Sequence, residues 1–366
     1  MDTTDTNIVF NEAGVCDHCL TFDRDILPNW NYGKGKSSEL AELIENIKTK
    51  GRSKDFDCIL GLSGGIDSSY LLHILVTKYN LRPLVFHVDA GWNSQIATNN
   101  IEKLIERLNL DLYTEVINWN EMKDLQLAFI KSGVPHIDTP QDHAFFATLY
   151  KFASKYNVKD IITGGNYSTE CVRNPKEWMY FQSDKVQLED IHRVFGQSKL
   201  NSFPRTNILW HKIWLPYFSG IKLHRLLDLF EYDKNSALEE LENEYGFQPY
   251  PQKHFESRFT RFYESFWLFE RFGFDTRKVQ LSSLILTNQI SREEALEILK
   301  RKPYDEETIN NDFRFIADKL DITEKELKQY LEAPLKKFSD YKNMSYIYDF
   351  GSLVFRFLGL ERGGKR

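Results

Sequence analysis

Residues 57–75 read DCILGLSGGIDSSYLLHIL, and this pattern predicts a strand, a sharp turn and a helix in succession. The apolar run from Cys58 to Leu62 has the length and composition of a buried parallel strand. Gly64 and Gly65 then allow backbone angles that side chains forbid. A strand, a glycine-rich turn and a helix start form an anion site, because the free N–H groups and the dipole of the first helical turn attract negative charge.

A phosphate or pyrophosphate is the predicted ligand of this turn. The hydroxyl groups of Ser63, Ser68 and Ser69 add hydrogen-bond donors beside the backbone. The turn lacks the Gly-Lys-Ser/Thr sequence of a Walker loop and the Gly-x-Gly-x-x-Gly sequence of a dinucleotide fingerprint. A tight turn that binds no ligand is the alternative interpretation, and the motif in its strand–helix context favours binding.

The sequence SGGIDSS at residues 63–69 resembles the PP-loop of the ATP pyrophosphatase superfamily. Enzymes of this superfamily split ATP into AMP and pyrophosphate and leave an adenylated substrate. The resemblance implies ATP binding by Ser63, Gly64, Gly65, Asp67, Ser68 and Ser69. It also makes Asp67 a candidate catalytic residue and a candidate Mg²⁺ ligand.

Strands and helices alternate from residue 57 to residue 166. Further strands are predicted at 81–88, 112–117 and 158–163, with helices between them. The alternation predicts an α/β fold with a doubly wound parallel sheet of the PP-loop ATP pyrophosphatase type, followed by a mostly helical C-terminal region. Ligands of such sheets bind beyond the carboxyl ends of the strands. The resemblance therefore places Asp89 and the stretch Gly164, Gly165 and Asn166 beside the adenosine.

Residues 138–156 are predicted to form a helix with Thr139 at its N-cap and Pro140 at its first position. Asp142 and His143 follow Gln141 and match a family-like Gln-Asp-His cluster whose role is not assigned. For His143, a structural role near a helix start explains the sequence at least as well.

Composition narrows the class of protein. The 366 residues carry a net charge of −6, which disfavours a broad nucleic-acid-binding face. The polar, acidic start is not that of a signal peptide, and no apolar stretch is long enough to span a membrane. Four cysteines in a chain of this length favour a reducing compartment, so a cytoplasmic location is expected.

Cys16 and Cys19 form a Cys-x-x-Cys pair, which is half of a tetrahedral zinc site. Two free thiols explain the pair equally well. The sequence from Met1 to Cys19 resembles the start of N-acetyl sugar amidotransferases, which act in bacterial surface-polysaccharide synthesis. In that family a further Cys-x-x-Cys commonly precedes the stretch that begins here at Met1, so both zinc binding and the position of the true start stay open.

Three regions are predicted: an N-terminal Cys-x-x-Cys segment at 1–36, a PP-loop ATP-binding domain at 37–170, and an aromatic-rich, mostly helical substrate or partner region at 171–366. Seven aromatic residues crowd the stretch from 178 to 218, and most of them are predicted to lie in a core: Trp178, Tyr180, Phe181, Trp210, Trp214, Tyr217 and Phe218. The aromatic stripe at 255–269 has helical spacing and is also interpreted as core. The opposite face carries Lys253, Glu256, Arg258, Arg261 and Glu264. It is either a solvated charged face or a cationic set near the phosphates, with Lys253 and Arg258 as candidate catalytic residues.

The resemblance to N-acetyl sugar amidotransferases extends over nearly the full length. It implies a reaction in which the acetamido oxygen of a nucleotide-linked sugar attacks the α-phosphate of ATP and ammonia then displaces AMP, giving an acetamidino sugar for lipopolysaccharide or O-antigen. ATP and Mg²⁺ are the expected cofactors, with Zn²⁺ if the cysteine pair binds metal. Position 2 is Asp2 and no catalytic-elbow cysteine is evident, so the resemblance implies separate glutaminase and ammonia-channel subunits.

Two alternatives stay open. A PP-loop enzyme could modify tRNA by thiolation or lysidine formation, although the acidic charge and the lack of an evident catalytic thiol disfavour this. The chain could instead be a non-catalytic scaffold that binds nucleotide or a glutaminase. The intact PP-loop motif disfavours this, because a protein that has lost catalysis is expected to lose the motif as well. Neither the sugar, the position of its acetamido group nor the oligomeric state can be read from the sequence.

Overall fold

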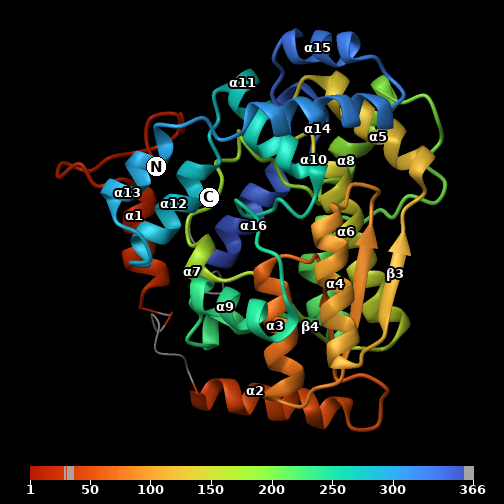
Figure 1. Cartoon of the computed structure of the whole chain (residues 1–366), viewed down its shortest axis with the longest axis vertical. Coiled ribbons are helices and arrows are strands. Elements are labelled where there is room, and N and C mark those ends of the chain that lie inside the picture. Colours follow the sequence, from red (N-terminus) through yellow and green to blue (C-terminus); the bar gives the residue numbers. More distant parts are fainter. Residues whose placement is uncertain (29, 31–36, 358–366) are drawn as a thin grey trace.

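The computed structural model describes residues 1–28, 30 and 37–357 (Figure 1). Five strands form a parallel sheet in the order β3-β2-β1-β4-β5. Their bounds are β1 Cys58–Gly61, β2 Pro83–Asp89, β3 Leu112–Val116, β4 Asp160–Ile162 and β5 Lys222–His224. The predicted doubly wound α/β fold is thereby confirmed.

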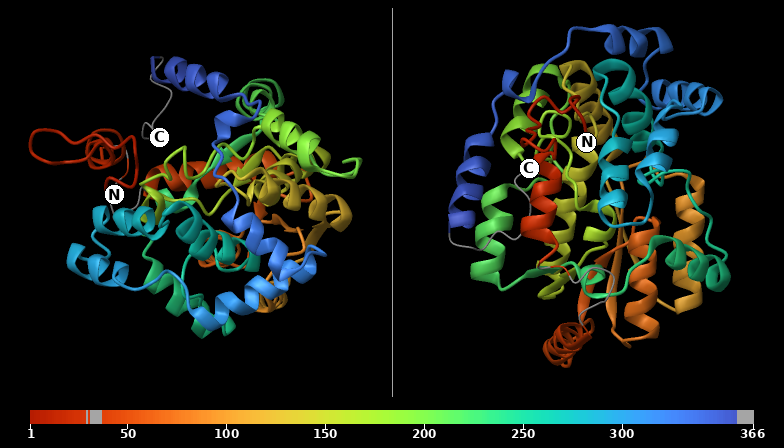
Figure 2. Two further views of the ribbon diagram at one scale, coloured as in Figure 1. Left: turned by 90° about the horizontal axis from the view of Figure 1, so that it is seen from above. Right: turned by 90° about the vertical axis from the view of Figure 1, so that its left-hand side faces the viewer.

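Helices make up most of the remaining structure and become more frequent toward the C-terminus (Figures 1 and 2). The helices of the first half are α1 Asp17–Thr21, α2 Ser37–Gly51, α3 Ile66–Thr77, α4 Gln95–Leu108, α5 Trp119–Ser132, α6 Thr139–Lys155 and α7 Tyr167–Glu170. Those of the second half are α8 Lys185–Phe195, α9 Lys234–Tyr245, α10 Arg258–Arg261, α11 Leu268–Phe272, α12 Arg277–Leu286, α13 Arg292–Leu299, α14 Glu306–Lys319, α15 Glu324–Glu332 and α16 Ser345–Phe357. Three segments are π-helical: η1 Phe22–Ile26, η2 Trp210–Ser219 and η4 Phe262–Trp267. Two short segments are 3-10 helices: η3 Leu226–Leu229 and η5 Phe338–Asp340.

Successive side chains of a strand point to opposite sides of the sheet, and apolar cores cover both of its faces. On one face, Cys58 and Leu60 of β1 pack in a core with apolar residues of α2, α3, α4 and α9. On the other face, Ile59 of β1 packs with residues of α6 and with Leu215 and Ile221. A strand buried on both faces needs an unbroken apolar run, which is what residues 58–62 provide.

The strand order reverses direction between β1 and β4. From β1 the chain proceeds outward to β2 and β3, and it then returns to the other side of β1 with β4 and β5. Ile59 and Leu60 of β1 are in register with Ile161 and Ile162 of β4. The loops that follow these two strands therefore diverge at a topological switch point, where a crevice for ligands forms in open parallel sheets.

A second core lies in the helical part of the chain. Buried residues of α5, α8 and α14 pack around the aromatic stripe of α10, η4 and α11. The stripe residues Phe259 and Phe262 are fully buried, so its interpretation as core is confirmed. A capping box formed by Ser291 and Glu294 begins α13.

Two local predictions were wrong. The N-cap of α6 is Asp138 rather than Thr139, which is the first helical residue. Of the seven aromatic residues grouped in that prediction, Trp178 and Tyr180 are buried, but four lie at the surface. The exposed members are Trp210, Trp214, Tyr217 and Phe218, with 42%, 48%, 63% and 68% of their surface accessible. Three of them stack on one another along η2 because they recur every fourth residue.

The fifth strand was not predicted. It contains three residues, Lys222–His224, which is too short to give a periodic signal, and it extends the sheet with residues from the region assigned to 171–366. The predicted boundary at residue 36 lies outside the described residues. In the part of the chain that the structure describes, no helix combines the length and the apolar character needed to cross a membrane.

Candidate functional site

A cavity of about 490 Å³ opens at the switch point between β1 and β4. Its walls come from the turn after β1, the turn after β4, helix α6 and the loop before α10. The predicted PP-loop contributes Ser63, Gly65, Asp67 and Ser68 to this lining. The sequence pattern and the strand topology thus lead to the same place in the fold.

Serine hydroxyl groups of the PP-loop form hydrogen bonds within the loop and hold its turn. The Oγ atoms of Ser63 and Ser68 lie 3.2 Å apart, and the Gly65 N–H donates to Ser63 Oγ at 3.2 Å. The loop can turn this sharply because Gly64 adopts a φ of +85°. Gly65 is the N-cap of α3 and has no side chain to accept the N–H groups of the first helical turn. Those donors stay available to an anion in the cavity.

The second glycine turn packs directly against the first. A Cβ atom on Gly164 would come within 3.0 Å of the Ser68 nitrogen and 3.2 Å of the Asp67 side chain. A Cβ atom on neighbouring Gly165 would meet no atom closer than 3.6 Å. Of these two residues, only Gly164 must lack a side chain for the second turn to pack closely against the PP-loop.

Asp67 forms the centre of a buried polar network. Its carboxylate accepts hydrogen bonds from the Lys253 Nζ at 2.7 Å and from the Tyr232 hydroxyl. Lys253 also pairs with Glu170 at 2.7 Å and donates to Thr169 Oγ1 at 2.9 Å. Burial opposes the charge of Asp67, but Lys253 and Tyr232 outweigh it and hold the Asp67 pKa below its usual value. Both Asp67 and Lys253 are ionised near neutral pH.

Sequence reasoning missed several residues of this cavity. Lys234 and Glu170 line it, and the Tyr232 hydroxyl donates a hydrogen bond to Asp67. Lys234 lies at the start of α9, where burial lowers the pKa of its amine and Asp67 opposes that effect. None of these positions belongs to a motif, so only the tertiary fold could reveal them.

Helix α6 brings a group of buried acids to the opposite wall. Asp138 and Asp142 lie one helical turn apart, and Asp142 lines the cavity together with His254. The His254 Nδ1 pairs with Glu264 Oε1 at 3.0 Å, and although burial lowers the pKa of His254, Glu264 raises it to about 9. Burial raises the pKa of Asp142, and the carboxylates of Asp138 and Glu264 raise it further. The structure therefore brings the predicted Asp142 to the cavity.

His143, by contrast, has a structural role. Its ring is fully buried, its Nδ1 donates to the Gln182 carbonyl oxygen at 2.7 Å, and its Nε2 accepts the Thr206 N–H at 3.1 Å. Burial lowers the pKa of His143 to about 4, so the ring is neutral. The structural interpretation of His143 fits this geometry.

Four predicted ATP-site residues lie outside the cavity lining, namely Gly64, whose carbonyl oxygen accepts a hydrogen bond from the Tyr250 hydroxyl, and three residues with other contacts. Asp89 ends β2 and accepts hydrogen bonds from the Gly91 N–H at 2.8 Å and from Asn93 at 3.2 Å. Asn166 caps α7 through the Thr169 N–H at 2.9 Å. Ser69 is fully buried, and its hydroxyl has no hydrogen-bond partner among the described residues. In this conformation each of them is turned toward the protein rather than the cavity.

The predicted charged face at 253–264 does not act as one unit. Lys253 and Glu256 line the cavity, and Glu264 is buried against His254. Arg258 and Arg261 instead hold the buried carboxylate of Asp312 on α14, at 2.8 Å and 2.7 Å. The hypothesis of a single cationic set near the phosphates was therefore wrong, because the helix divides these side chains between the cavity and a second core.

The cysteine pair lies apart from the cavity. The sulfur atoms of Cys16 and Cys19 are 3.5 Å apart, and neighbouring His18 is paired with Asp5 at 2.9 Å. Within residues 1–28, 30 and 37–357, no group of three or more histidine, cysteine or acidic side chains is arranged to hold a metal ion. Two thiols do not complete a tetrahedral zinc site, so the described residues do not fit zinc.

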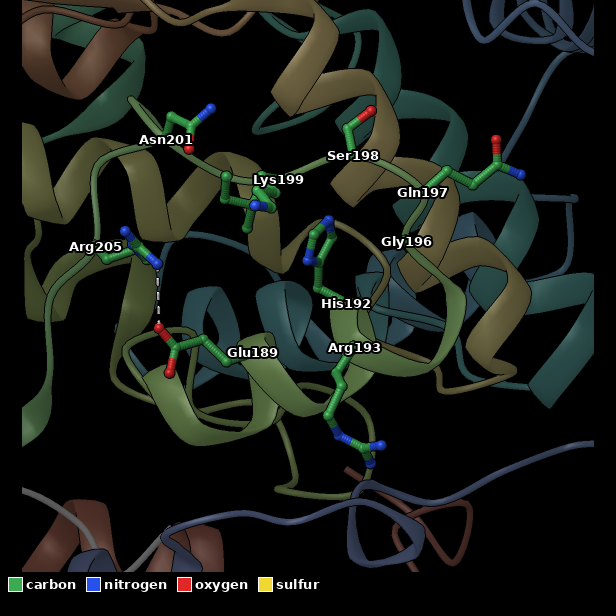
Figure 3. Close-up of a pocket in the computed structure, with 10 residues that line it drawn as sticks. Glu189, His192, Arg193, Gly196, Gln197, Ser198, Lys199, Asn201 and Arg205 are labelled. Atoms are coloured by element: carbon green, nitrogen blue, oxygen red, sulfur yellow. Dashed lines mark hydrogen bonds and ion pairs between the residues drawn. The ribbon is translucent and has the colours of Figure 1, made fainter.

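A second cavity of about 520 Å³ is lined by α8 and the loop after it (Figure 3). Its charged side chains are largely held by neighbours. Arg205 pairs with Glu189 at 3.3 Å, and His192 pairs with Asp124 of α5 at 2.8 Å. No lining residue is shared with the cavity at the PP-loop. The first ion pair joins the loop to α8 and the second joins α8 to α5, and neither gives an indication of a ligand.

Comparison with protein families gives a match in the C-terminal part of the chain. Residues 256–354 match the family of WbpG-like lipopolysaccharide (LPS) biosynthesis proteins, in their C-terminal domain. For this similarity, they are called the WbpG-like domain. The match confirms the predicted resemblance to proteins of LPS biosynthesis. It begins at Glu256, which lines the PP-loop cavity. The WbpG-like domain and the parallel sheet therefore meet at this site.

Other relatives are more remote. An uncharacterized protein of Methanocaldococcus jannaschii is 32% identical over 182 residues, which are 48% of this chain and 61% of that protein. The chain thus aligns with less than two thirds of that relative. Among solved structures, NMN synthetase from Francisella tularensis is 18% identical with a TM-score of 0.31, covering 71% of this chain and 94% of that one. The NH3-dependent NAD synthetase from Campylobacter jejuni is 15% identical with a TM-score of 0.33, covering 82% and 98%. Likenesses at this level do not bear on activity.

Proposed function

We propose that this protein is an ATP-dependent amidotransferase that converts the acetamido group of a nucleotide-linked sugar into an acetamidino group for surface polysaccharide. The observation that carries the proposal is the shared cavity, in which an intact PP-loop faces the first residue of a WbpG-like LPS biosynthesis domain. An amide carbonyl is a poor electrophile, and activation by adenylation makes its oxygen a leaving group. A phosphate site beside a sugar-related domain suits that chemistry.

The PP-loop residues fit the phosphates of ATP. The helix N-terminus at Gly65, the hydroxyls of Ser63 and Ser68, and the close glycine contact at Gly164 form a concave, donor-rich surface. The adenosine would lie across the turns that follow β1 and β4. Mg²⁺ bound with ATP would share the charge of the departing pyrophosphate, and Asp67 is its candidate ligand on this chain.

The chain's own cations would stabilise the leaving group. The acetamido oxygen attacks the α-phosphorus, the bond from that phosphorus to the bridging oxygen breaks, and pyrophosphate departs with the electron pair. Lys253 and Lys234 lie on the cavity wall where this negative charge would develop. Asp67 and Glu170 fix the position of the Lys253 amine before substrate binds, so little reorganisation is needed.

Ammonia is proposed to come from separate glutaminase and channel subunits. A glutaminase of the cysteine type needs a reactive thiolate. Burial raises the pKa of the Cys171 thiol to about 11, and it raises that of Cys58 further. The Cys19 pKa is also raised to about 11, by burial and by Cys16. These three thiols are therefore poor nucleophiles near neutral pH.

Pyrophosphate release tests the proposed function. The protein is mixed with ATP, ammonium and a panel of UDP-linked acetamido sugars, and in a parallel arm with bulk tRNA. We expect release that depends on one sugar, with a product lighter by the difference between O and NH. Release that depends on tRNA would instead assign the protein to RNA modification. ATP binding without release for any acceptor would leave a non-catalytic scaffold.

The two neighbouring glycines after β4 provide a matched pair of variants. Gly164→Ala forces a methyl group against the backbone of Ser68, so the PP-loop must shift. We expect pyrophosphate release to fall about tenfold, since the Ser68 backbone must move by a few tenths of an ångström and catalysis depends on close positioning. Gly165→Ala adds the same methyl group at ordinary contact distance, 3.6 Å from Glu170 Oε2, and should keep most of the activity. Equal losses in both variants would contradict the close contact at Gly164.

A further inference from the structure

The π-helical segment η2 carries aromatic side chains on its exposed side. Leu215 of this segment is buried beside Ile221 in the core on one face of the sheet, so the opposite side of η2 points outward. There the rings of Trp210, Trp214 and Phe218 stack in a row, with centroids 5.7 Å and 4.9 Å apart. We call these three exposed rings the aromatic ladder. A continuous apolar surface of this kind on a folded chain indicates a docking site.

Several lysines lie where η2 ends, at the amino edge of the sheet. The Lys159 Nζ donates to the carbonyl oxygen of Ser219, the last residue of η2, at 2.9 Å. The Lys222 N–H donates to the Lys159 carbonyl oxygen at 2.7 Å. The Lys54 Nζ donates, also at 2.7 Å, to the carbonyl oxygen two residues before Lys159. Strands β4 and β5 begin beside these contacts, so the lysines lie at the edge opposite the PP-loop cavity.

These lysines carry positive charge that acids only partly balance. Together with the last residue of α6 they form a set that we call the lysine group: Lys54, Lys155, Lys159 and Lys222. In the described part of the chain, no acid pairs with any of the four. The nearby acids Asp160 and Asp57 are already paired with Lys50 at 2.9 Å and Arg82 at 2.6 Å. Exposed Asp55, next to Lys54, offsets one of the four charges, so the group stays positive.

We propose that the aromatic ladder and the lysine group dock this protein on the surface of a membrane that contains anionic phospholipids. Tryptophan suits the boundary between acyl chains and headgroups, because its ring is apolar and its N–H is polar. Lysines near an anionic bilayer attract the headgroup phosphates, and each of them raises the affinity about fivefold. The proposal concerns where the protein works, and it does not depend on the reaction that we propose for it.

Stacking within the ladder favours a lipid surface over a nucleic acid, which aromatic and basic side chains can also bind. Bases need free ring faces, but Trp214 stacks on Trp210 and on Phe218, at interplanar angles of 14° and 19°. Its two faces are thus covered, and the ring edges stay accessible. Such edges can insert among lipid headgroups. A second copy of the chain is disfavoured as well, because two copies joined by this surface would bring their lysine groups together.

Docking through this surface leaves the PP-loop cavity accessible. The cavity opens beyond the carboxyl ends of β1 and β4, whereas the lysine group lies at the amino ends of the strands. Helix α2, which leads into Lys54, lies below the sheet at the bottom of Figure 1. No member of the aromatic ladder or of the lysine group lines the cavity. Membrane binding and ATP binding can therefore occur together.

The first test is co-sedimentation with vesicles made of phosphatidylglycerol and phosphatidylcholine in equal parts. We expect the wild-type protein to bind them at low salt, to be released by about 0.5 M NaCl, and to ignore vesicles of phosphatidylcholine alone. The double variant Trp210→Gln and Trp214→Gln should bind at least about tenfold more weakly and keep its Tm within about 2 °C, because both side chains are exposed. Phe10→Gln, at an exposed ring of the N-terminal segment, should bind like the wild type.

Charge reversals provide a matched pair of variants. Lys155→Glu with Lys222→Glu changes the lysine group. Lys325→Glu with Lys328→Glu makes the same change of net charge on the exposed side of α15, at the top of Figure 1. We expect the first pair to weaken vesicle binding at least about tenfold and the second pair to stay within about twofold of the wild type. Equal losses in the two pairs would overturn the proposal, because net charge alone would then explain the binding.

Quenching by brominated lipids tests whether the ladder enters the bilayer. Trp210 and Trp214 are exposed, whereas the other five tryptophans are buried or half-buried. Bromine in the acyl chains should therefore quench tryptophan fluorescence in the wild type and much less in the double tryptophan variant. Vesicle binding without quenching would overturn the proposal. Retention of bulk tRNA, or self-association, that the double variant loses without any vesicle binding would overturn it too. None of these outcomes involves pyrophosphate release, so the proposed function is judged separately.

Discussion

Asp67→Asn is expected to abolish pyrophosphate release while the fold survives. The substitution keeps the shape of the side chain but removes the charge that holds Lys253 at 2.7 Å. Lys253 keeps Glu170 and Thr169 as partners, and Tyr232 can donate to the amide oxygen, so little stability should be lost. We expect a fall of at least a thousandfold in the rate of pyrophosphate release with the acceptor sugar, since a candidate metal ligand and the anchor of a cation are lost together.

Substitutions at two serines of the same motif, Ser63 and Ser69, test whether the loss of release is specific to residues that line the cavity. Ser63→Ala removes a hydroxyl that lines the cavity and accepts the Gly65 N–H, and it too should abolish release. Ser69→Ala removes a fully buried hydroxyl with no hydrogen-bond partner among the described residues, so it should leave release within about threefold of the wild type and slightly raise Tm. Wild-type turnover by Asp67→Asn or Ser63→Ala would contradict the assignment of the loop.

The sequence predicted the part of the site that is local in the chain. Residues 58–69 carry their own strand pattern, glycine pair and hydroxyl groups, so the PP-loop could be placed without a structure. Gly164 could be placed as well, because the turn after β4 has the same glycine signal. Local propensity and motif chemistry agree in these segments, and such agreement makes a segment predictable.

Lys253 was predicted as a candidate near the phosphates, but its contact with Asp67 could not be predicted, because the partners of Asp67 come together only in three dimensions. Lys253 meets Asp67 across 186 residues, and Tyr232 meets it across 165. A lysine or tyrosine outside a motif has no neighbour in the sequence that reports such a contact. The helical pattern at 255–269 correctly identified the buried aromatic face, but it could not tell which charges would face the cavity.

The position of Arg258 illustrates this limit of sequence-based prediction. Its partner Asp312 is the site of the second large effect that we expect, which is on stability. Asp312 is fully buried and accepts hydrogen bonds from Arg258 and Arg261, and Arg258 also stacks on Phe315 with 3.7 Å between the guanidinium carbon and the ring centre. Asp312→Ala leaves two partly buried cations without their shared anion. We expect the free energy of unfolding to fall by about 3 kcal/mol, measured by urea denaturation. Asp318→Ala, on the exposed face of α14, should change it by less than about 0.5 kcal/mol.

A triple variant separates a structural role of Arg258 from a catalytic one. Replacing a buried ion network with apolar side chains of similar volume is often neutral or stabilising. Arg258→Met, Arg261→Met and Asp312→Leu together should therefore recover most of the stability that Asp312→Ala loses. Because Arg258 contacts Asp312 and Phe315 rather than the cavity, this variant should keep pyrophosphate release within about tenfold of the wild type. A stable triple variant without release would return Arg258 to the catalytic set, since lost packing could no longer explain lost turnover.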